Sequence, residues 1–94
     1  MTLFTARVEL HGADWSDYER LHDQMRRQGF QLTITSDQGS KYKLPPAEYA
    51  YKGNATRDDV LAKAKTAAGA VKTKFAVMVT EAVGVTWFGL QTAA

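Results

Sequence analysis

Apolar and polar residues alternate near the start of the chain. Between positions 3 and 10 every second residue is apolar, and mostly polar or charged residues stand between them. This period of two predicts a strand with one buried face. That face is expected to hold Phe4, Ala6, Val8 and Leu10. Comparable patterns predict further strands over residues 30–35, 41–44, 48–52, 75–81 and 86–91.

Two segments instead repeat their apolar residues three and four positions apart, which predicts helices. The first helix is expected over about residues 15–28, with Asp14 as its N-cap and Gly29 as its C-terminal cap. The second helix follows Thr56, which can form a capping box with Asp59. Alanines dominate the apolar side of this second helix, so it can approach a sheet closely.

The order of these elements predicts the fold class. Residues 36–40 read Ser-Asp-Gln-Gly-Ser, a turn composition, and Pro45 and Pro46 place the preceding strand at an edge or a kink. The resulting order is β-α-β-β-α-β with an extra C-terminal strand over residues 86–91. We therefore expect an α+β, ferredoxin-like sandwich, in which both helices cover one face of an antiparallel sheet and the other face is polar.

Length and composition limit the class of protein. A chain of 94 residues fits a single domain over residues 1–94, and the absence of cysteine excludes disulfides, thiolate zinc sites and cysteine nucleophiles. The first residues lack the basic and apolar regions of a signal peptide. No apolar run approaches the ~20 residues of a membrane span. We expect a soluble, cytoplasmic protein with no membrane contact.

The charges are unevenly distributed along the chain. Residues 1–40 hold four arginines and six acidic residues, a net charge of −2, whereas residues 41–94 hold eight basic and four acidic residues, a net charge of +4. Clustered basic side chains can bind the phosphates of a nucleic acid. Lysines that keep a small domain soluble would give the same pattern. Charge alone therefore leaves both interpretations open.

Of the two histidines, His22 has the more informative position. It lies on the apolar stripe of the first helix, between Tyr18 and Met25. A histidine that titrates near neutral pH can act as general acid or base in RNA cleavage, where a 2′-hydroxyl loses its proton. A half-buried packing histidine is the alternative. His11 follows the first strand and is expected to be a loop residue without such a role.

Basic residues supply the candidate phosphate ligands. The first helix carries Arg20, Arg26 and Arg27, and the spacing of Asp23 and Arg27 also fits an ordinary helical ion pair. Lys41 and Lys43 flank an aromatic residue, a pattern that suits single-stranded nucleic acid. The same two lysines would equally protect an edge strand from aggregation.

No recognised motif predicts a cofactor or metal site. The sequence has no glycine-rich phosphate loop, no nucleophile elbow and no zinc-ligand spacing. Asp58 and Asp59 could hold Mg²⁺, but their place in the first turn of a helix favours capping. Asp14 is likewise interpreted as a cap. We expect neither a metal nor a cofactor.

Seven runs of the sequence are informative when they are taken together, namely residues 7–11, 14–15, 28–30, 33–39, 44–49, 79–81 and 86–90. They resemble the GhoS-like proteins, a family of small bacterial proteins, and the resemblance extends over nearly the whole chain. The founding member of the family is the endoribonuclease antitoxin of a type V toxin–antitoxin system. The resemblance implies a ferredoxin-like fold and cleavage of the messenger RNA of a small membrane-acting toxin.

Two positions set this chain apart within that resemblance. Three consecutive residues that are Arg-Leu-Arg in the founding member are Arg20-Leu21-His22 here. A titratable imidazole therefore replaces the permanently charged guanidinium of the second arginine. His11 stands about where related CRISPR-associated ribonucleases carry a metal-binding aspartate. The expected enzyme is therefore metal-independent. His22 and Arg20 would act in catalysis, and the RNA phosphates would be bound by Arg26, Arg27, Lys41 and Lys43.

The alternative function is a non-catalytic module of a mobile element, which binds protein or RNA through a sheet edge. The kink at Pro45 and Pro46, with Tyr49 and Tyr51 expected to be exposed beside it, would suit strand addition. A homodimer formed through sheet edges is compatible with either function.

Overall fold

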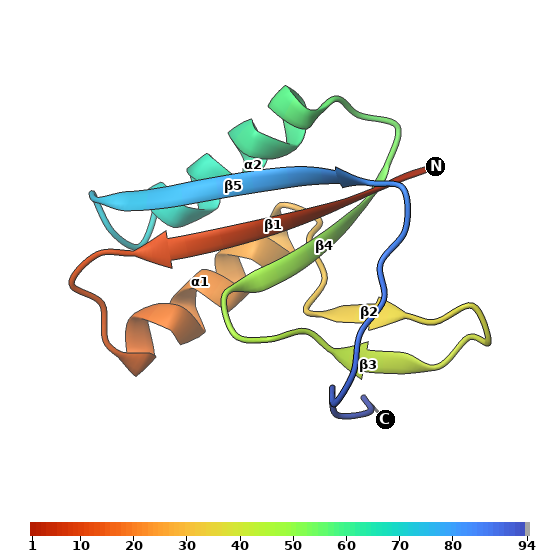
Figure 1. The fold of residues 1–94 in the computed structure, drawn as a ribbon. Coiled ribbons are helices and arrows are strands. Elements are labelled where there is room, and N and C mark those ends of the chain that lie inside the picture. The colour runs from red at the N-terminus through yellow and green to blue at the C-terminus, as the bar shows by residue number, and fades with distance from the viewer. Residues whose placement is uncertain (94) are drawn as a thin grey trace.

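The computed structural model of the chain describes residues 1–93. Its class is α+β, consistent with the ferredoxin-like sandwich that the sequence predicts, but its element order is β-α-β-β-β-α-β, with three strands instead of two between the helices (Figure 1). The elements are β1 (Thr2–Leu10), α1 (Trp15–Arg27), β2 (Thr33–Thr35), β3 (Lys41–Lys43), β4 (Glu48–Gly53), α2 (Arg57–Gly69) and β5 (Phe75–Ala82).

The central sheet is antiparallel, with the strand order β4-β1-β5. β2 and β3 form a separate hairpin, in which Ile34 is paired with Tyr42. This hairpin joins the central sheet through one bridge, where the backbones of Gln31 and Ala50 exchange two hydrogen bonds of 2.7 and 2.9 Å. The predicted second strand is thus split into this bridge and the short β2. The hairpin extends beyond β4, away from β5 (Figure 1).

Both helices cover the same face of the sheet and enclose the core (Figure 1). The predicted alternation of β1 is confirmed, because the four apolar residues of its inner face are buried. α2 packs against β1, β5 and α1. Its buried residues are mostly small, so its backbone can approach the sheet. They are Val60, Ala64, Ala67 and Ala68.

The helix ends are fixed by the caps that the sequence predicts. The Asp14 side chain accepts a hydrogen bond from the backbone N–H of Asp17, and the Asp17 carboxylate accepts one from the backbone N–H of Asp14. Thr56 and Asp59 form the same box on α2. α1 ends before Gly29, whose φ of +92° is a conformation that glycine adopts readily.

Asp17 also ties α1 to the end of α2. Its carboxylate accepts a hydrogen bond of 2.6 Å from Arg20 and lies 3.3 Å from the ammonium group of Lys72. The Arg20 guanidinium, followed by the backbone bond to Asp14, lowers the pKa of Asp17 to about 2. The carboxylate therefore stays ionised at all ordinary pH values, which keeps this link intact.

Two expectations are corrected by the structure. No strand forms over residues 86–91; instead, Thr92 forms a single bridge with Tyr42, so the chain pairs beside β3 one residue beyond the predicted strand. Tyr49 is 0% exposed and Tyr51 is half-buried, whereas both were expected at the surface. The register explains this burial, because Tyr49 and Tyr51 pair with the inward-facing Ala6 and Phe4.

Candidate functional site

Three predicted site residues come together in one cleft beside α1. His22, Arg26 and Lys43 line a cavity of about 310 Å³, hereafter the His22 cleft. His22 and Arg26 share a helix face because they are four residues apart. Lys43 ends β3 and faces them from the hairpin. Pro45 and Pro46 follow it and form another part of the cleft wall.

His22 is held in place by a buried tyrosine. The distance between His22 Nδ1 and the Tyr49 hydroxyl is 2.8 Å, and the two rings meet edge to face at 5.7 Å. Burial, and secondly the nearby charge of Arg26, lower the pKa of His22. The ring is therefore neutral at pH 7. Because Nδ1 is occupied by Tyr49, Nε2 is the nitrogen with no hydrogen-bond partner within residues 1–93.

Tyr49 remains protonated under all relevant conditions, because its burial raises the pKa of the phenol far above its usual value. Its hydroxyl can either accept the proton of Nδ1 or donate its own to that nitrogen. In the first arrangement Nε2 has a free lone pair and can act as a base. In the second arrangement Nε2 carries a proton and can only donate one.

The cationic side chains of the cleft reach solvent. The Arg26 side chain is 57% exposed and forms a 2.9 Å hydrogen bond with Asp23, which leaves further guanidinium donors free. Arg26 rather than Arg27 is thus the ion-pair partner of Asp23, in contrast to the predicted spacing. The Lys43 side chain is exposed and forms no salt bridge with a described residue. Both cations are available to a phosphate.

The other predicted site residues lie elsewhere. Arg20 and Arg27 line a shallow hollow between α1 and the end of α2, and Arg20 is engaged by Asp17. Residues two apart on a helix point in different directions, which separates Arg20 from His22. Lys41 is exposed on β3 but does not line the His22 cleft. The structure thus brings three of the six candidate site residues together in the His22 cleft.

Residues that the sequence analysis did not select complete the cleft. Trp15 exposes its indole at one side, and Glu48 contributes a carboxylate that is fixed by a 3.2 Å ion pair with Arg7. Ala93 closes another side because the C-terminal residues run along β3. The position of Trp15 in the first turn of α1, about two turns before His22 and so on the same side of the helix, is the only sequence signal that could have suggested its place.

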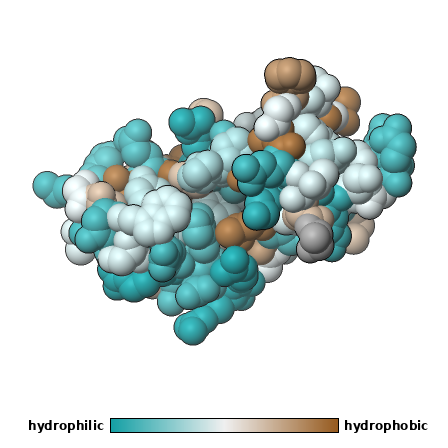
Figure 2. Space-filling model, turned by 90° about the horizontal axis from the view of Figure 1, so that it is seen from below, coloured by the Kyte–Doolittle hydropathy of each residue, from teal (hydrophilic) through white to brown (hydrophobic). Residues whose placement is uncertain are grey.

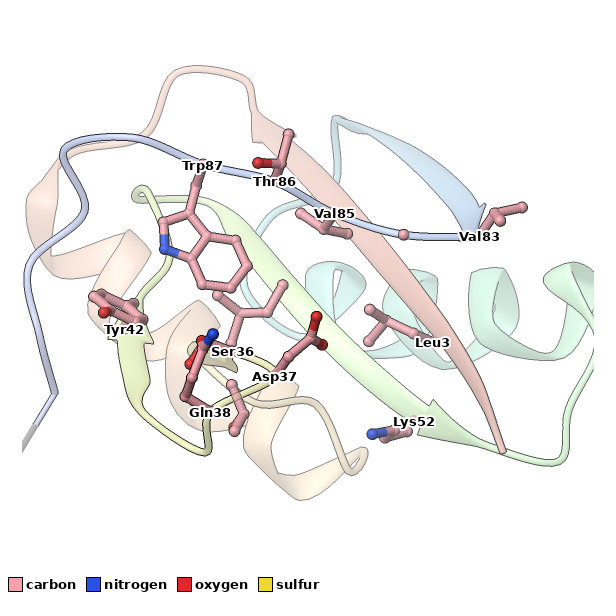
Figure 3. Close-up of a pocket in the computed structure, with 13 residues that line it drawn as sticks. Leu3, Ser36, Asp37, Gln38, Tyr42, Lys52, Val83, Val85, Thr86 and Trp87 are labelled. Carbon is pink, nitrogen blue, oxygen red and sulfur yellow. The ribbon is translucent and has the colours of Figure 1, made fainter.

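A second cavity, of about 470 Å³, lies on the other side of the hairpin and is hereafter called the Trp87 groove (Figure 3). Trp87 reaches from the C-terminal segment toward the hairpin, where its ring packs 5.4 Å from that of Tyr42. Asp37 projects from the hairpin turn back toward the C-terminal segment, and Lys52 lies on β4. None of the predicted site residues lines this groove.

Figure 2 shows the face seen from below Figure 1, on which hydrophilic side chains predominate and hydrophobic ones form small separate patches.

Residues 1–93 contain no group of three or more His, Asp or Glu side chains placed to hold a metal ion. Over the same residues, neither helix has the length and apolar character needed to cross a membrane.

No protein-family model matches the chain, and no curated protein is significantly similar to it. Membership of the GhoS-like family therefore stays a prediction from the sequence.

Proposed function

We propose that this protein is an endoribonuclease of the GhoS-like type, which cuts single-stranded RNA without a metal ion in the His22 cleft. One observation supports this proposal above all others: the fold places a neutral imidazole, a guanidinium and an ammonium group around one cavity. Cleavage by attack of the 2′-hydroxyl needs these groups, because it requires a proton acceptor and cations beside the phosphate.

The reaction can be written with the residues of the cleft. Arg26 and Lys43 bind the non-bridging oxygens of the scissile phosphate, whose charge grows in the transition state. His22 Nε2 takes the proton of the 2′-hydroxyl as its oxygen bonds to phosphorus. The bond between phosphorus and the 5′ oxygen breaks, and His22 passes the proton to that oxygen. The products are a 2′,3′-cyclic phosphate and a 5′-hydroxyl.

Tyr49 serves as a positioning residue in this mechanism. Base catalysis requires the tautomer that carries its proton on Nδ1, and the Tyr49 hydroxyl 2.8 Å away can accept that proton. The lowered pKa of His22 keeps Nε2 unprotonated at pH 7, and hence ready to act as a base. By the resemblance noted above, the substrate would be the messenger RNA of a small membrane-acting toxin.

The proposal is tested by the cleavage of labelled single-stranded RNA in the presence of EDTA. The wild-type protein should cut, and His22→Ala should lose at least about a hundredfold in rate, the usual contribution of a general base. His11→Ala is the matched control, because His11 is exposed and paired with Glu9 outside the cleft. A folded His22→Ala variant that cuts like the wild-type protein would overturn the proposal.

A second candidate function, a non-catalytic interaction module, is favoured by the free edge of β5. Within the described residues β5 pairs only with β1, and Met78 on this edge strand is 65% exposed. Such an edge can accept a strand from a partner or from a second copy of the chain. Tyr49 and Tyr51 take no part, since they face the core.

The two candidate functions differ in what a change at β5 should do. If the edge is an interface, Met78→Lys should convert a dimer into a monomer, as measured by analytical ultracentrifugation. If the wild-type protein is a monomer at micromolar concentration, the dimer version of this second function is wrong. RNA cleavage by Met78→Lys should be unchanged if the His22 cleft is the active site.

A further inference from the structure

We propose that the Trp87 groove binds one unpaired base of the RNA, and that it prefers guanine. This inference rests on the proposed function, because it takes RNA as the ligand. It concerns a different cavity from the site of cleavage, which lies on the other side of the hairpin.

The groove offers a stacking surface. Trp87 is only partly covered, since its ring contacts Tyr42 at an interplanar angle of 58° and the remainder borders the cavity (Figure 3). Aromatic side chains that border a polar groove are the usual platforms for unpaired bases. Tyr42 is itself held in place, because its backbone pairs with Ile34 on one side and Thr92 on the other.

Polar groups of the groove are free to bind a ligand. Within residues 1–93, no hydrogen bond engages the Asp37 carboxylate, the Gln38 amide or the Lys52 ammonium group, although all three line the cavity. The backbone of the turn that carries Asp37 and Gln38 is ordered by two hydrogen bonds, in which the Ser36 N–H donates to the Ser40 carbonyl and the Gly39 N–H donates to the Ser36 carbonyl. A fixed turn with unpaired side chains can discriminate between ligands.

The carboxylate of Asp37 favours guanine among the four bases. An ionised carboxylate only accepts hydrogen bonds, and its two oxygens accept two parallel donors best. The Watson–Crick edge of guanine offers two adjacent donors, N1–H and the 2-amino group. Adenine, cytosine and uracil each present one donor beside an acceptor, which the carboxylate would repel. Lys52 supplies a positive charge for a neighbouring phosphate.

The hairpin connects the groove to the cleft. Successive residues of a strand point to opposite faces, and accordingly Tyr42 lines the Trp87 groove while Lys43 lines the His22 cleft. The base-binding site and the catalytic site thus share β3 as a common wall. A base held at Trp87 would fix the register of the strand relative to His22, and so select where the RNA is cut.

The test uses binding of RNA that cannot be cut. Fluorescein-labelled 2′-O-methyl oligouridine with one central guanosine should bind the wild-type protein at least several-fold more tightly than the same oligomer with central adenosine. Trp87→Ala should weaken binding of the guanosine oligomer about tenfold, the lower range of a lost stacking contact. Asp37→Asn should remove the preference for guanosine without weakening the binding of all-uridine RNA.

A control variant keeps the outcomes separate. Asp58→Asn removes an exposed acidic group that lies outside the groove, so it should keep the guanosine preference. Asp37→Asn lies in an exposed turn and tests the groove without touching the aromatic packing. Equal affinity for guanosine and adenosine oligomers, or unchanged binding by a folded Trp87→Ala variant, would overturn this inference. Because no cleavage is measured, this failure is distinct from that of the proposed enzyme.

Discussion

His22 illustrates how a neighbouring residue determines what an imidazole can do. If Tyr49 accepts the Nδ1 proton, its oxygen stabilises the charged ring, and Tyr49→Phe should lower the pKa of His22 further. NMR titration of the histidine resonances in the wild-type and variant proteins measures this change. A rise of the pKa in Tyr49→Phe would mean that Tyr49 donates to His22, and Nε2 would then be unsuited to act as a base.

The lowered pKa of His22 also makes stability depend on pH. The unfolded chain binds this proton more readily than the folded protein does, so the contribution of His22 is complete above the ordinary value of 6.5. It is lost as the pH falls through the lower pKa of the folded state. In His22→Gln this part of the pH dependence should disappear from urea unfolding curves, and His11→Gln should retain it.

The pKa of Asp17 is also lowered, so its contribution to stability changes with pH in the same direction as that of His22 but over a lower pH range. Because its pKa falls from 3.8 to about 2 on folding, its contribution to stability is complete above pH 3.8 and is lost as the pH approaches 2. Asp17→Asn should lower the melting temperature at pH 7 by several degrees, since it removes the N-cap partner and both ion pairs. Asp37→Asn, whose carboxylate binds no described residue, should melt like the wild-type protein.

At the scale of elements, α2 depends on small side chains. Ala64 is 0% exposed where the helix packs, whereas Ala62 faces solvent. Ala64→Leu should reduce the free energy of unfolding by about 1–3 kcal/mol, the usual cost of overpacking a core. Ala62→Leu adds the same atoms at the surface and should change it little. Urea denaturation checks both variants, and equal stabilities would contradict the described packing of α2.

Elements whose signals are local could be predicted from the sequence. β1 has a strict alternation of buried and exposed positions, α1 and α2 have capping boxes, and the structure confirms all three elements. Alternation showed that Tyr49 and Tyr51 share a face but could not say which face. That answer depends on the register with β1, which involves residues more than forty positions away. The C-terminal residues likewise pair with β3 only because the fold brings them there.

The candidate site could likewise be predicted only where it depends on local sequence patterns. The shared face of His22 and Arg26 follows from helical spacing. The approach of Lys43, Trp15 and Glu48 depends on how the hairpin and β4 meet α1, so no local pattern indicates it. The Trp87 groove was not foreseen for the same reason, since it lies between the C-terminal segment and a turn.

At the scale of the whole molecule, the excess of positive charge in residues 41–94 should make the affinity for RNA depend on salt concentration. If Lys43 contacts a phosphate, Lys43→Ala should reduce the slope of log affinity against log salt by about 0.7 for a single strand. Lys65→Ala removes an exposed charge from α2, away from both cavities, and should leave the slope unchanged. Equal slopes in all three proteins would place the RNA elsewhere.

The central claim is that RNA lies in the His22 cleft. The most direct measurement is titration of ¹⁵N-labelled protein with an uncleavable 2′-O-methyl RNA, followed residue by residue in NMR spectra. The largest shifts are expected at His22, Arg26 and Lys43. Shifts confined to β5, or no shifts at millimolar RNA, would contradict the claim.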